Sequence, residues 1–150
     1  MTTIKDTLRA DLATNLKARN ELETSVLRAV LGEVQSQEKA GKTAVEFDDA
    51  KVLEVLGKLV KQRRESATIY TDAGATDRAT RETAEADFLA KYLPVQLTDE
   101  EVEAYVDAAI ATFDAPAMKD FGAIMKVVVA ATKGRADGKV VSALVKAKIA

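Results

Sequence analysis

Residues 61–97, KQRRESATIYTDAGATDRATRETAEADFLAKYLPVQL, decide the fold of this chain. Small or apolar side chains recur in and just before this stretch at helical spacings of three, four and seven residues, and Arg63 lies on the same stripe as Leu56, Val60, Ala67 and Tyr70. A guanidinium that faces a core needs an anionic partner, because an unpaired buried charge is costly. The stretch therefore predicts two antiparallel helices joined by a polar clamp, whose candidate members are Arg63, Arg64, Glu82 and Glu85. The alternative role for the two arginines is contact with phosphate or with a partner.

The periodicity elsewhere in the chain is also helical, and no segment alternates in the manner of a β-strand. Glycine, proline and N-capping residues separate the helical patterns: Gly74 and Pro94 end two of them, and Asp137 precedes the last. We expect an all-α fold with helices at about residues 3–18, 21–39, 49–73, 76–92, 98–113, 118–132 and 138–149.

The connector Pro94-Val95-Gln96-Leu97 suggests a domain boundary, since Thr98 and the acids after it form a capping box that opens the next helix. We interpret residues 1–94 as a four-helix N-terminal domain and residues 95–150 as a small three-helix C-terminal domain.

The composition excludes several classes of function. The 150 residues include no histidine and no cysteine, which removes Ser-His and Cys-His nucleophiles, thiol chemistry, disulfides and the commonest zinc ligands. Any catalysis would use carboxylates, lysine or tyrosine, and we identify no catalytic, cofactor-binding or metal-binding residues. The chain shows neither a secretory signal nor an apolar run long enough for a membrane span, so we expect a cytoplasmic protein without a membrane partner.

Two residue groups invite a catalytic or metal-binding interpretation and do not support it well. Ser66 lies near Lys61, but no oxyanion-stabilising motif accompanies the pair. Asp48 and Asp49 could hold a metal with Glu54, although adjacent acids before a helix are usually caps.

Charge is divided unevenly within the C-terminal part. Residues 98–114 carry six acids and no base, whereas residues 119–150 carry seven bases and two acids. Such a basic surface can contact several phosphates. The simpler explanation is that acids at helix starts and lysines at helix ends are favoured by the helix dipole.

The turn Gly134-Arg135-Ala136-Asp137-Gly138-Lys139 resembles a phosphate-binding loop but fails the Walker pattern, because three residues separate its glycines and Val140 follows the lysine. Two interpretations stay open. Gly134 and Asp137 can act as helix caps, or the turn can present Arg135, Lys139 and helix-terminal amides to a phosphate.

The motifs taken together resemble the YqeY family. They include KQRRES, Ala73-Gly74, Tyr92-Leu93-Pro94-x-Gln96-Leu97, Phe121-Gly122-x-x-Met125 and the Gly134–Lys139 turn, and Leu27-Arg28 and Glu38 also fit. One departure is Ala75, where the family often has a basic residue. The resemblance covers essentially the whole chain.

The resemblance implies an all-helical protein whose C-terminal domain is like the tail of GatB, a subunit of the tRNA-dependent amidotransferase. In that enzyme the tail helps to grip tRNA, and other domains perform catalysis. The family label is carbon-nitrogen ligase activity with glutamine as amido-N-donor, but the catalytic domains are absent here.

We therefore expect a non-catalytic protein that binds tRNA or other structured RNA, or an accessory to an amidotransferase or a tRNA synthetase component. In that case the phosphate contacts would come from Lys126, Lys133, Arg135 and Lys139. The alternative is a protein–protein interaction adaptor with no nucleic-acid ligand.

Overall fold

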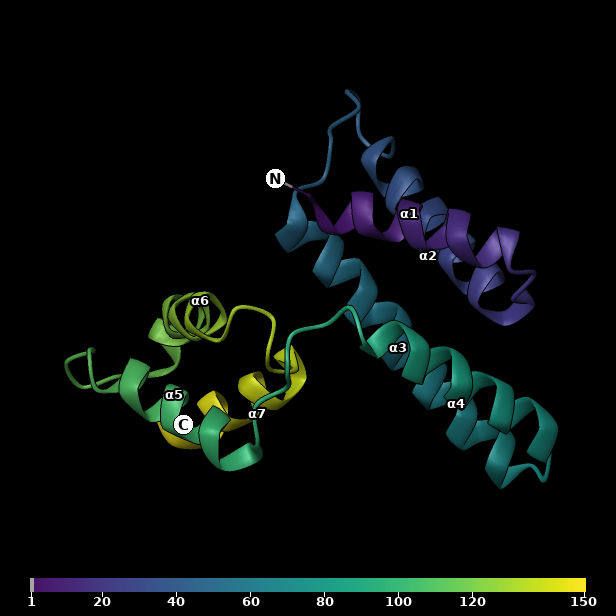
Figure 1. Ribbon diagram of the computed structural model, residues 1–150. Coiled ribbons are helices and arrows are strands. Elements are labelled where there is room, and N and C mark those ends of the chain that lie inside the picture. Colours follow the sequence, from purple (N-terminus) through teal and green to yellow (C-terminus); the bar gives the residue numbers. More distant parts are fainter. Residues whose placement is uncertain (1) are drawn as a thin grey trace. The chain divides into compact units, whose positions relative to one another are not determined.

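The computed structural model describes residues 2–150, and this range is helical with no β-strand. Figure 1 shows the helices, which are α1 (Ile4–Lys17), α2 (Glu21–Glu38), α3 (Asp49–Asp72), α4 (Thr76–Ala90), α5 (Asp99–Ile110), α6 (Phe121–Thr132) and α7 (Gly138–Ile149), with a 3-10 turn η1 (Met118–Asp120) before α6. The predicted all-α fold class is confirmed.

Contacts divide the chain into two compact units. The N-terminal unit consists of the described residues up to Leu93 and contains α1–α4; the C-terminal unit is Pro94–Ala150 and contains α5, η1, α6 and α7. The interpretation of residues 1–94 and 95–150 as a four-helix and a three-helix domain stays a prediction, because compactness alone does not show that either part folds by itself.

The N-terminal unit is built from two antiparallel helical hairpins, α1–α2 and α3–α4 (Figure 1). Its core is formed by apolar side chains from all four helices, which are Leu8, Val26, Leu27, Val30, Val34, Val52, Val55, Leu56, Val60, Ala86 and Leu89. Full burial of one such leucine or valine contributes about 1.5–3 kcal/mol. The core therefore lies where α1 and α2 meet the first half of α3 and the last half of α4.

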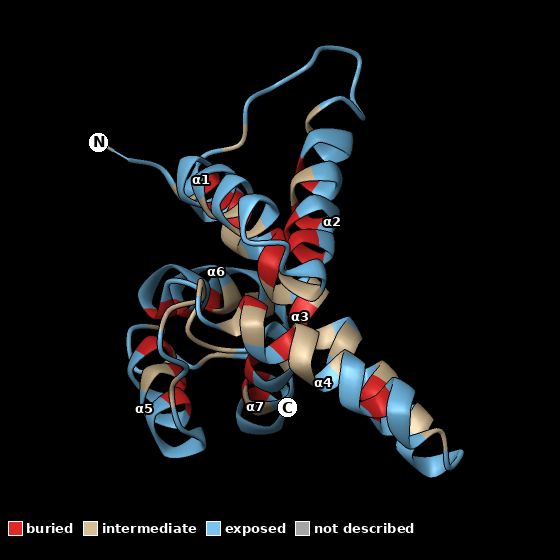
Figure 2. Ribbon diagram, turned by 45° about the vertical axis from the view of Figure 1, so that its right-hand side comes forward, coloured by how far each residue is buried: buried red, intermediate tan, exposed pale blue. Residues whose placement is uncertain are grey.

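The outer part of the α3–α4 hairpin has much less apolar packing. Between residues 64 and 83, Ala67 and Ala79 are the buried residues (Figure 2). Small side chains at both positions let the two helices approach closely but contribute little buried area. Gly74, with φ +76°, makes the left-handed turn between the helices as its sequence position predicts.

The C-terminal unit has a separate apolar core. It comprises one side of each helix, namely Val102, Val106, Ala109, Ile124, Val128, Val141, Val145 and Ile149. Figure 2 shows these buried segments on α5, α6 and α7. The spacing of three and four residues along every helix explains why the pattern was readable from the sequence.

Side-chain caps start several helices at the positions expected from the sequence. Asp48 accepts a hydrogen bond from the Lys51 amide at the start of α3, and Thr98 accepts one from the Glu101 amide at the start of α5. Asp48 thus acts as a cap. These bonds satisfy amides that have no partner inside the helix.

Three predicted helix ends differ from the structure. α4 ends at Ala90 and not at Tyr92, and α5 ends at Ile110 and not at Phe113, because the following residues form turns with tighter i to i−3 hydrogen bonds. The segment expected to begin a helix at residue 118 is a 3-10 turn that leads into α6 at Phe121.

Candidate functional site

The exposed lysines of the C-terminal unit are placed by the apolar side of α6. Ile124 and Val128 are fully buried, so Lys126, on the opposite side of the helix, is exposed. Lys133, the residue that follows α6, is exposed as well. Lys139 is exposed in the first turn of α7. None of the three lysines forms an ion pair with the described residues. Their charges are therefore available to an anionic ligand.

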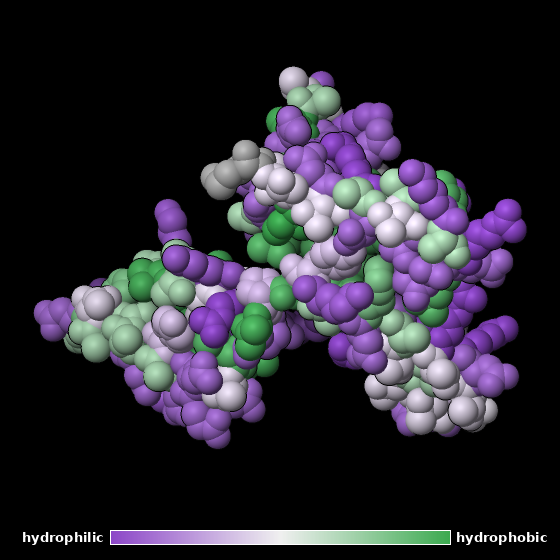
Figure 3. Space-filling model, in the orientation of Figure 1, coloured by the Kyte–Doolittle hydropathy of each residue, from purple (hydrophilic) through white to green (hydrophobic). Residues whose placement is uncertain are grey.

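The side of α6 that carries Lys126 is otherwise small or apolar. Val127 is 42% exposed and Val129 is 53% exposed, and Gly122 and Ala123 are also exposed. In Figure 3 the surface at the position of α6 combines green hydrophobic atoms with purple hydrophilic ones. The surface is thus basic without being uniformly polar.

Arg135, the fourth predicted phosphate contact, is engaged within the C-terminal unit. Its Nε donates a hydrogen bond of 2.9 Å to the carbonyl of Val95, and its own carbonyl accepts one of 2.8 Å from the amide of Leu97. Gln96 Nε2 donates to the carbonyl of Gly134 at 3.4 Å. These hydrogen bonds hold the connector at residues 94–97 against the α6–α7 turn. Arg135 therefore has a structural role that the sequence pattern did not reveal.

The α6–α7 turn has the geometry of two helix caps. Lys133 and Gly134 both have left-handed backbone conformations, with φ of 48° and 78°. The Asp137 side chain accepts a hydrogen bond of 2.8 Å from the Lys139 amide. An amide that a phosphate-binding loop would offer is thus occupied, which favours the interpretation of this turn as structural.

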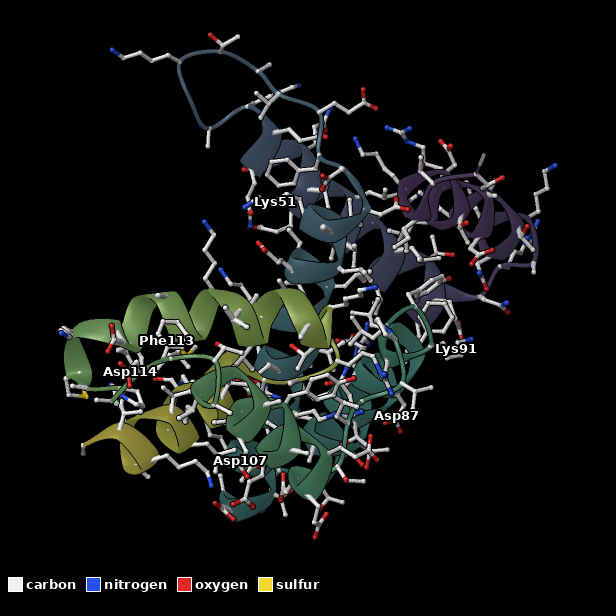
Figure 4. All side chains as sticks on the ribbon, turned by 90° about the vertical axis from the view of Figure 1, so that its left-hand side faces the viewer. Lys51, Asp87, Lys91, Asp107, Phe113 and Asp114 are labelled. Atoms are coloured by element: carbon white, nitrogen blue, oxygen red, sulfur yellow. The ribbon has the colours of Figure 1, made fainter. Side chains whose placement is uncertain are left out.

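Lys148 shows what a paired lysine looks like in the same unit. Its Nζ lies 2.8 Å from an Asp107 oxygen and 2.9 Å from a Glu103 oxygen (Asp107 is labelled in Figure 4). Hydrogen bonds to Asp107 and then to Glu103 raise the pKa of Lys148 above its ordinary value. Part of the basic C-terminal segment therefore neutralises the acidic helix α5.

The predicted polar clamp joins α3 and α4. Arg63 Nε lies 3.2 Å from a Glu85 oxygen, and Nη1 donates to the carbonyl of Leu59 at 3.3 Å. The side chains of Arg63 and Glu85 are only 16% and 12% exposed. These two bonds satisfy the guanidinium on the apolar stripe. Its partner Glu85 also accepts a hydrogen bond of 3.2 Å from Arg81.

The other two predicted members of the clamp are placed differently. Arg64 pairs with Asp87 at 3.1 Å, and both side chains are largely exposed (Asp87 is labelled in Figure 4). Among the described residues, Glu82 forms no ion pair with either arginine. Glu82 lies one turn earlier on α4 than Glu85, out of line with Arg63.

Two further polar contacts in the N-terminal unit were missed. Lys5 is 6% exposed and its Nζ lies 2.5 Å from a Glu38 oxygen, which also accepts a 2.6 Å hydrogen bond from the Phe47 amide. The hydrogen bonds from Lys5 and then from the Phe47 amide hold the pKa of Glu38 below its ordinary value. The sequence contained one signal for the burial of Lys5, which is its spacing of three residues before Leu8, a residue of the apolar stripe.

The second missed contact links the end of α4 to α1. The Tyr92 hydroxyl donates a short hydrogen bond to Asp11. Burial and then the bond to Asp11 raise the pKa of Tyr92 above its ordinary value of 10.0. Tyr92 lies in a motif already noted in the sequence, but nothing there indicated its partner on a helix 81 residues earlier.

The described residues contain no cluster of three or more acidic, histidine or cysteine side chains suited to a metal ion. No helix in this range is long and apolar enough to cross a membrane.

The comparison with protein families shows to which family the chain belongs. The family model described as "Yqey-like protein" matches residues 5–149. The chain belongs to the YqeY family. The resemblance noted from the sequence motifs is therefore confirmed.

Two curated relatives are both named "Altered inheritance of mitochondria protein 41, mitochondrial". The one from Komagataella phaffii is 36% identical over 112 residues, which cover 69% of this chain and 58% of that protein. The one from Clavispora lusitaniae is 35% identical over 99 residues, covering 64% of this chain and 56% of that protein. The matched region of this YqeY protein thus spans less than two thirds of either relative. Both relatives are mitochondrial by name, and a cytoplasmic location for this chain stays a prediction.

Proposed function

We propose that this YqeY protein is a non-catalytic accessory protein that binds tRNA or another structured RNA through the basic side of α6 and the start of α7. The observation that carries the proposal is the difference among its lysines. Lys126, Lys133 and Lys139 are exposed and have no acidic partner among the described residues, whereas Lys148 is held by two acids. Unpaired surface cations bind phosphates favourably because they release counterions from the RNA.

The mode of binding that this surface supports is contact with the phosphate backbone. Its lysines lie in α6, directly after α6 and in the first turn of α7. The aromatic content of the chain is only 5%, which leaves few platforms for base stacking. Recognition would then rest on RNA shape and phosphate spacing. The family label of amidotransferase-type chemistry fits this proposal as an accessory role to an amidotransferase or a tRNA synthetase component.

The test is fluorescence anisotropy of labelled bulk tRNA with the full chain over a salt series. We expect log affinity to fall with log salt by roughly 0.7–0.9 per phosphate contacted. Lys126→Glu/Lys133→Glu should weaken binding and reduce that slope by about two. Arg135 is a poor choice for the variant, because its substitution would also break the hydrogen bond that holds the connector at residues 94–97.

The matched control is Lys42→Glu/Lys58→Glu, which makes the same change of net charge on exposed lysines of the N-terminal unit. This variant should keep most of the affinity. Equal losses in both variants would show that net charge, and not the α6 surface, governs binding, and the site assignment would then fail.

A second candidate is a protein–protein interaction adaptor, which the exposed valines on the same surface favour. Val129 and Val140 are 53% and 39% exposed, an apolar content that RNA contacts do not use. An absence of tRNA binding at low salt would favour this adaptor function over RNA binding.

A further inference from the structure

The α3–α4 hairpin extends beyond the apolar core of the N-terminal unit, and its outer part, residues 64–83, forms an arm (Figure 2). The core residues nearest to the arm are Val60 on α3 and Ala86 on α4. The arm takes no part in the proposed RNA contact, so its behaviour is independent of that proposal.

Apolar packing between the two helices is sparse in the arm. Its buried residues are two alanines, Ala67 and Ala79, which are 9% and 7% exposed. An open depression of about 340 Å³ is lined by Arg64, Ala67, Thr68, Thr71, Asp72 and Thr83, which come from both helices. Side chains thus leave part of the groove between the helices unfilled. A buried methyl group also stabilises much less than the leucines and valines of the core.

Polar contacts between the two helices are sparse in the arm as well. Among the described residues, no side-chain hydrogen bond or ion pair joins residues 65–72 to residues 76–84. A cation–π contact links the helices, with Arg78 Cζ 5.8 Å from the centre of the Tyr70 ring. Because Arg78 is exposed to water, this contact contributes little.

The sequence of the arm favours a helix only weakly. Six of its residues are β-branched and exposed, namely Thr68, Ile69, Thr71, Thr76, Thr80 and Thr83. Such side chains lose rotamer freedom in a helix, and their exposure gives no packing in return. Ala75 precedes α4 without a side-chain cap. Isolated helices shorter than about 12–15 residues are marginal in water, and the two helical segments of the arm, 64–72 and 76–83, are shorter than that.

We propose that the arm opens by local unfolding as one unit while the base of the hairpin stays closed, and that the ion pair of Arg63 with Glu85 marks the boundary. The two side chains of this pair are only 16% and 12% exposed. An opening that stops at the pair leaves it and the adjacent core intact, whereas a larger opening breaks both. Opening of the arm therefore costs less free energy than unfolding of the unit. The arm can change conformation against a partner without loss of the core.

The test is amide hydrogen exchange of the full chain, resolved by residue with nuclear magnetic resonance. It compares helical amides of the arm, at residues 68–72 and 80–83, with those of the buried Val30 and Leu56. We expect the arm amides to exchange at least about a hundredfold faster. About 1 M urea should accelerate the core amides and leave the arm amides nearly unchanged, because a local opening exposes little surface.

A pair of matched variants tests whether the arm is a unit of its own. Thr80→Ala/Thr83→Ala raises helix propensity at two exposed positions of α4 and should slow exchange throughout the arm by about fivefold. Thr7→Ala/Thr14→Ala makes the same change at exposed positions of α1 and should leave exchange in the arm unchanged.

A second pair of variants tests the boundary. Glu85→Ala removes the carboxylate that pairs with Arg63, so the fast-exchanging segment should extend to residues 60–63. Glu82→Ala should leave the boundary where it is. A fast-exchanging segment of unchanged length in Glu85→Ala would show that the ion pair does not set the boundary.

Equal exchange rates with equal urea dependence in the arm and in the core would overturn the proposal, because the hairpin would then open only with the whole unit. Equal slowing of the arm by the two double threonine variants would overturn it as well. Charge reversal of the α6 lysines should leave exchange in the arm unchanged, so this test and the tRNA-binding test succeed or fail independently.

Discussion

In the N-terminal unit several charged side chains are buried or largely buried between helices. In the C-terminal unit the interior is apolar and the charged side chains lie at the surface. Lys5, Arg63 and Glu85 are nearly or largely buried and each has a defined partner. The buried residues of the C-terminal unit are apolar except for Thr132.

The physical consequence concerns specificity. Apolar side chains tolerate small changes in helix register, but a partly buried ion pair is satisfied at one register only, because its partners must lie within hydrogen-bond distance. We infer that polar contacts fix the alignment of α3 with α4 and of α1 with α2, whereas α5, α6 and α7 rely on shape. The unpaired lysines of the C-terminal unit, Lys126, Lys133 and Lys139, lie at its surface. The following variants test this contrast, from the largest expected effect to the smallest.

Glu85→Ala should have the largest effect, because it leaves Arg63 without its carboxylate partner in a largely buried position. We expect a loss of about 2–4 kcal/mol in the free energy of unfolding. Urea denaturation followed by far-ultraviolet circular dichroism measures it. Glu82→Ala on the same helix is the matched control and should change stability by less than about 0.5 kcal/mol. Equal effects of the two variants would refute the importance of the buried pair.

Glu38→Gln should have the next largest effect, since it removes the charge that faces the buried Lys5. The pKa of Glu38 is lowered in the folded protein, so its stabilising contribution is present above its ordinary value of 4.5 and is lost as the pH falls through the folded value. Thermal unfolding between neutral pH and about pH 3 should therefore show a steeper loss for the unmodified chain than for Glu38→Gln. Glu33→Gln, at an exposed position of α2, should keep the steep loss.

Tyr92→Phe removes the hydroxyl that donates to Asp11 and should cost about 1 kcal/mol. Because the pKa of Tyr92 is raised above 10.0, the contribution of this phenol is complete below that pH and is lost as the pH rises through the folded value. Ultraviolet absorbance should show one tyrosine that ionises later than the others, and this delayed step should disappear in Tyr92→Phe. Persistence of the delayed ionisation in Tyr92→Phe would contradict its assignment to Tyr92. Tyr105→Phe is the control variant.

Lys148→Gln should have the smallest effect of the set. Its ion pairs with Glu103 and Asp107 involve acids that are 51% and 57% exposed, so water and salt screen them. The pKa of Lys148 is raised, so its contribution holds below its ordinary value of 10.5 and fades as the pH rises through the folded value. We expect a small drop in the unfolding midpoint that vanishes at high salt. A drop as large as that of Glu85→Ala would erase the contrast between the units.

The amino-acid sequence by itself determined the helices, their caps and the apolar side of each, because helical periodicity and capping depend on neighbours a few residues apart. It also placed Arg63 on the core-facing stripe of α3 and indicated a carboxylate on the next helix as its partner. The family was recognisable for the same reason, since its motifs are local in the chain.

Only the tertiary structure decided which partners meet. It paired Arg63 with Glu85 and Arg64 with Asp87, buried Lys5 against Glu38, and used Arg135 to hold the connector at residues 94–97. A shift of one helical turn, about 5.4 Å, exchanges one carboxylate for another, and the sequence pattern contains no information at that scale about how two helices align.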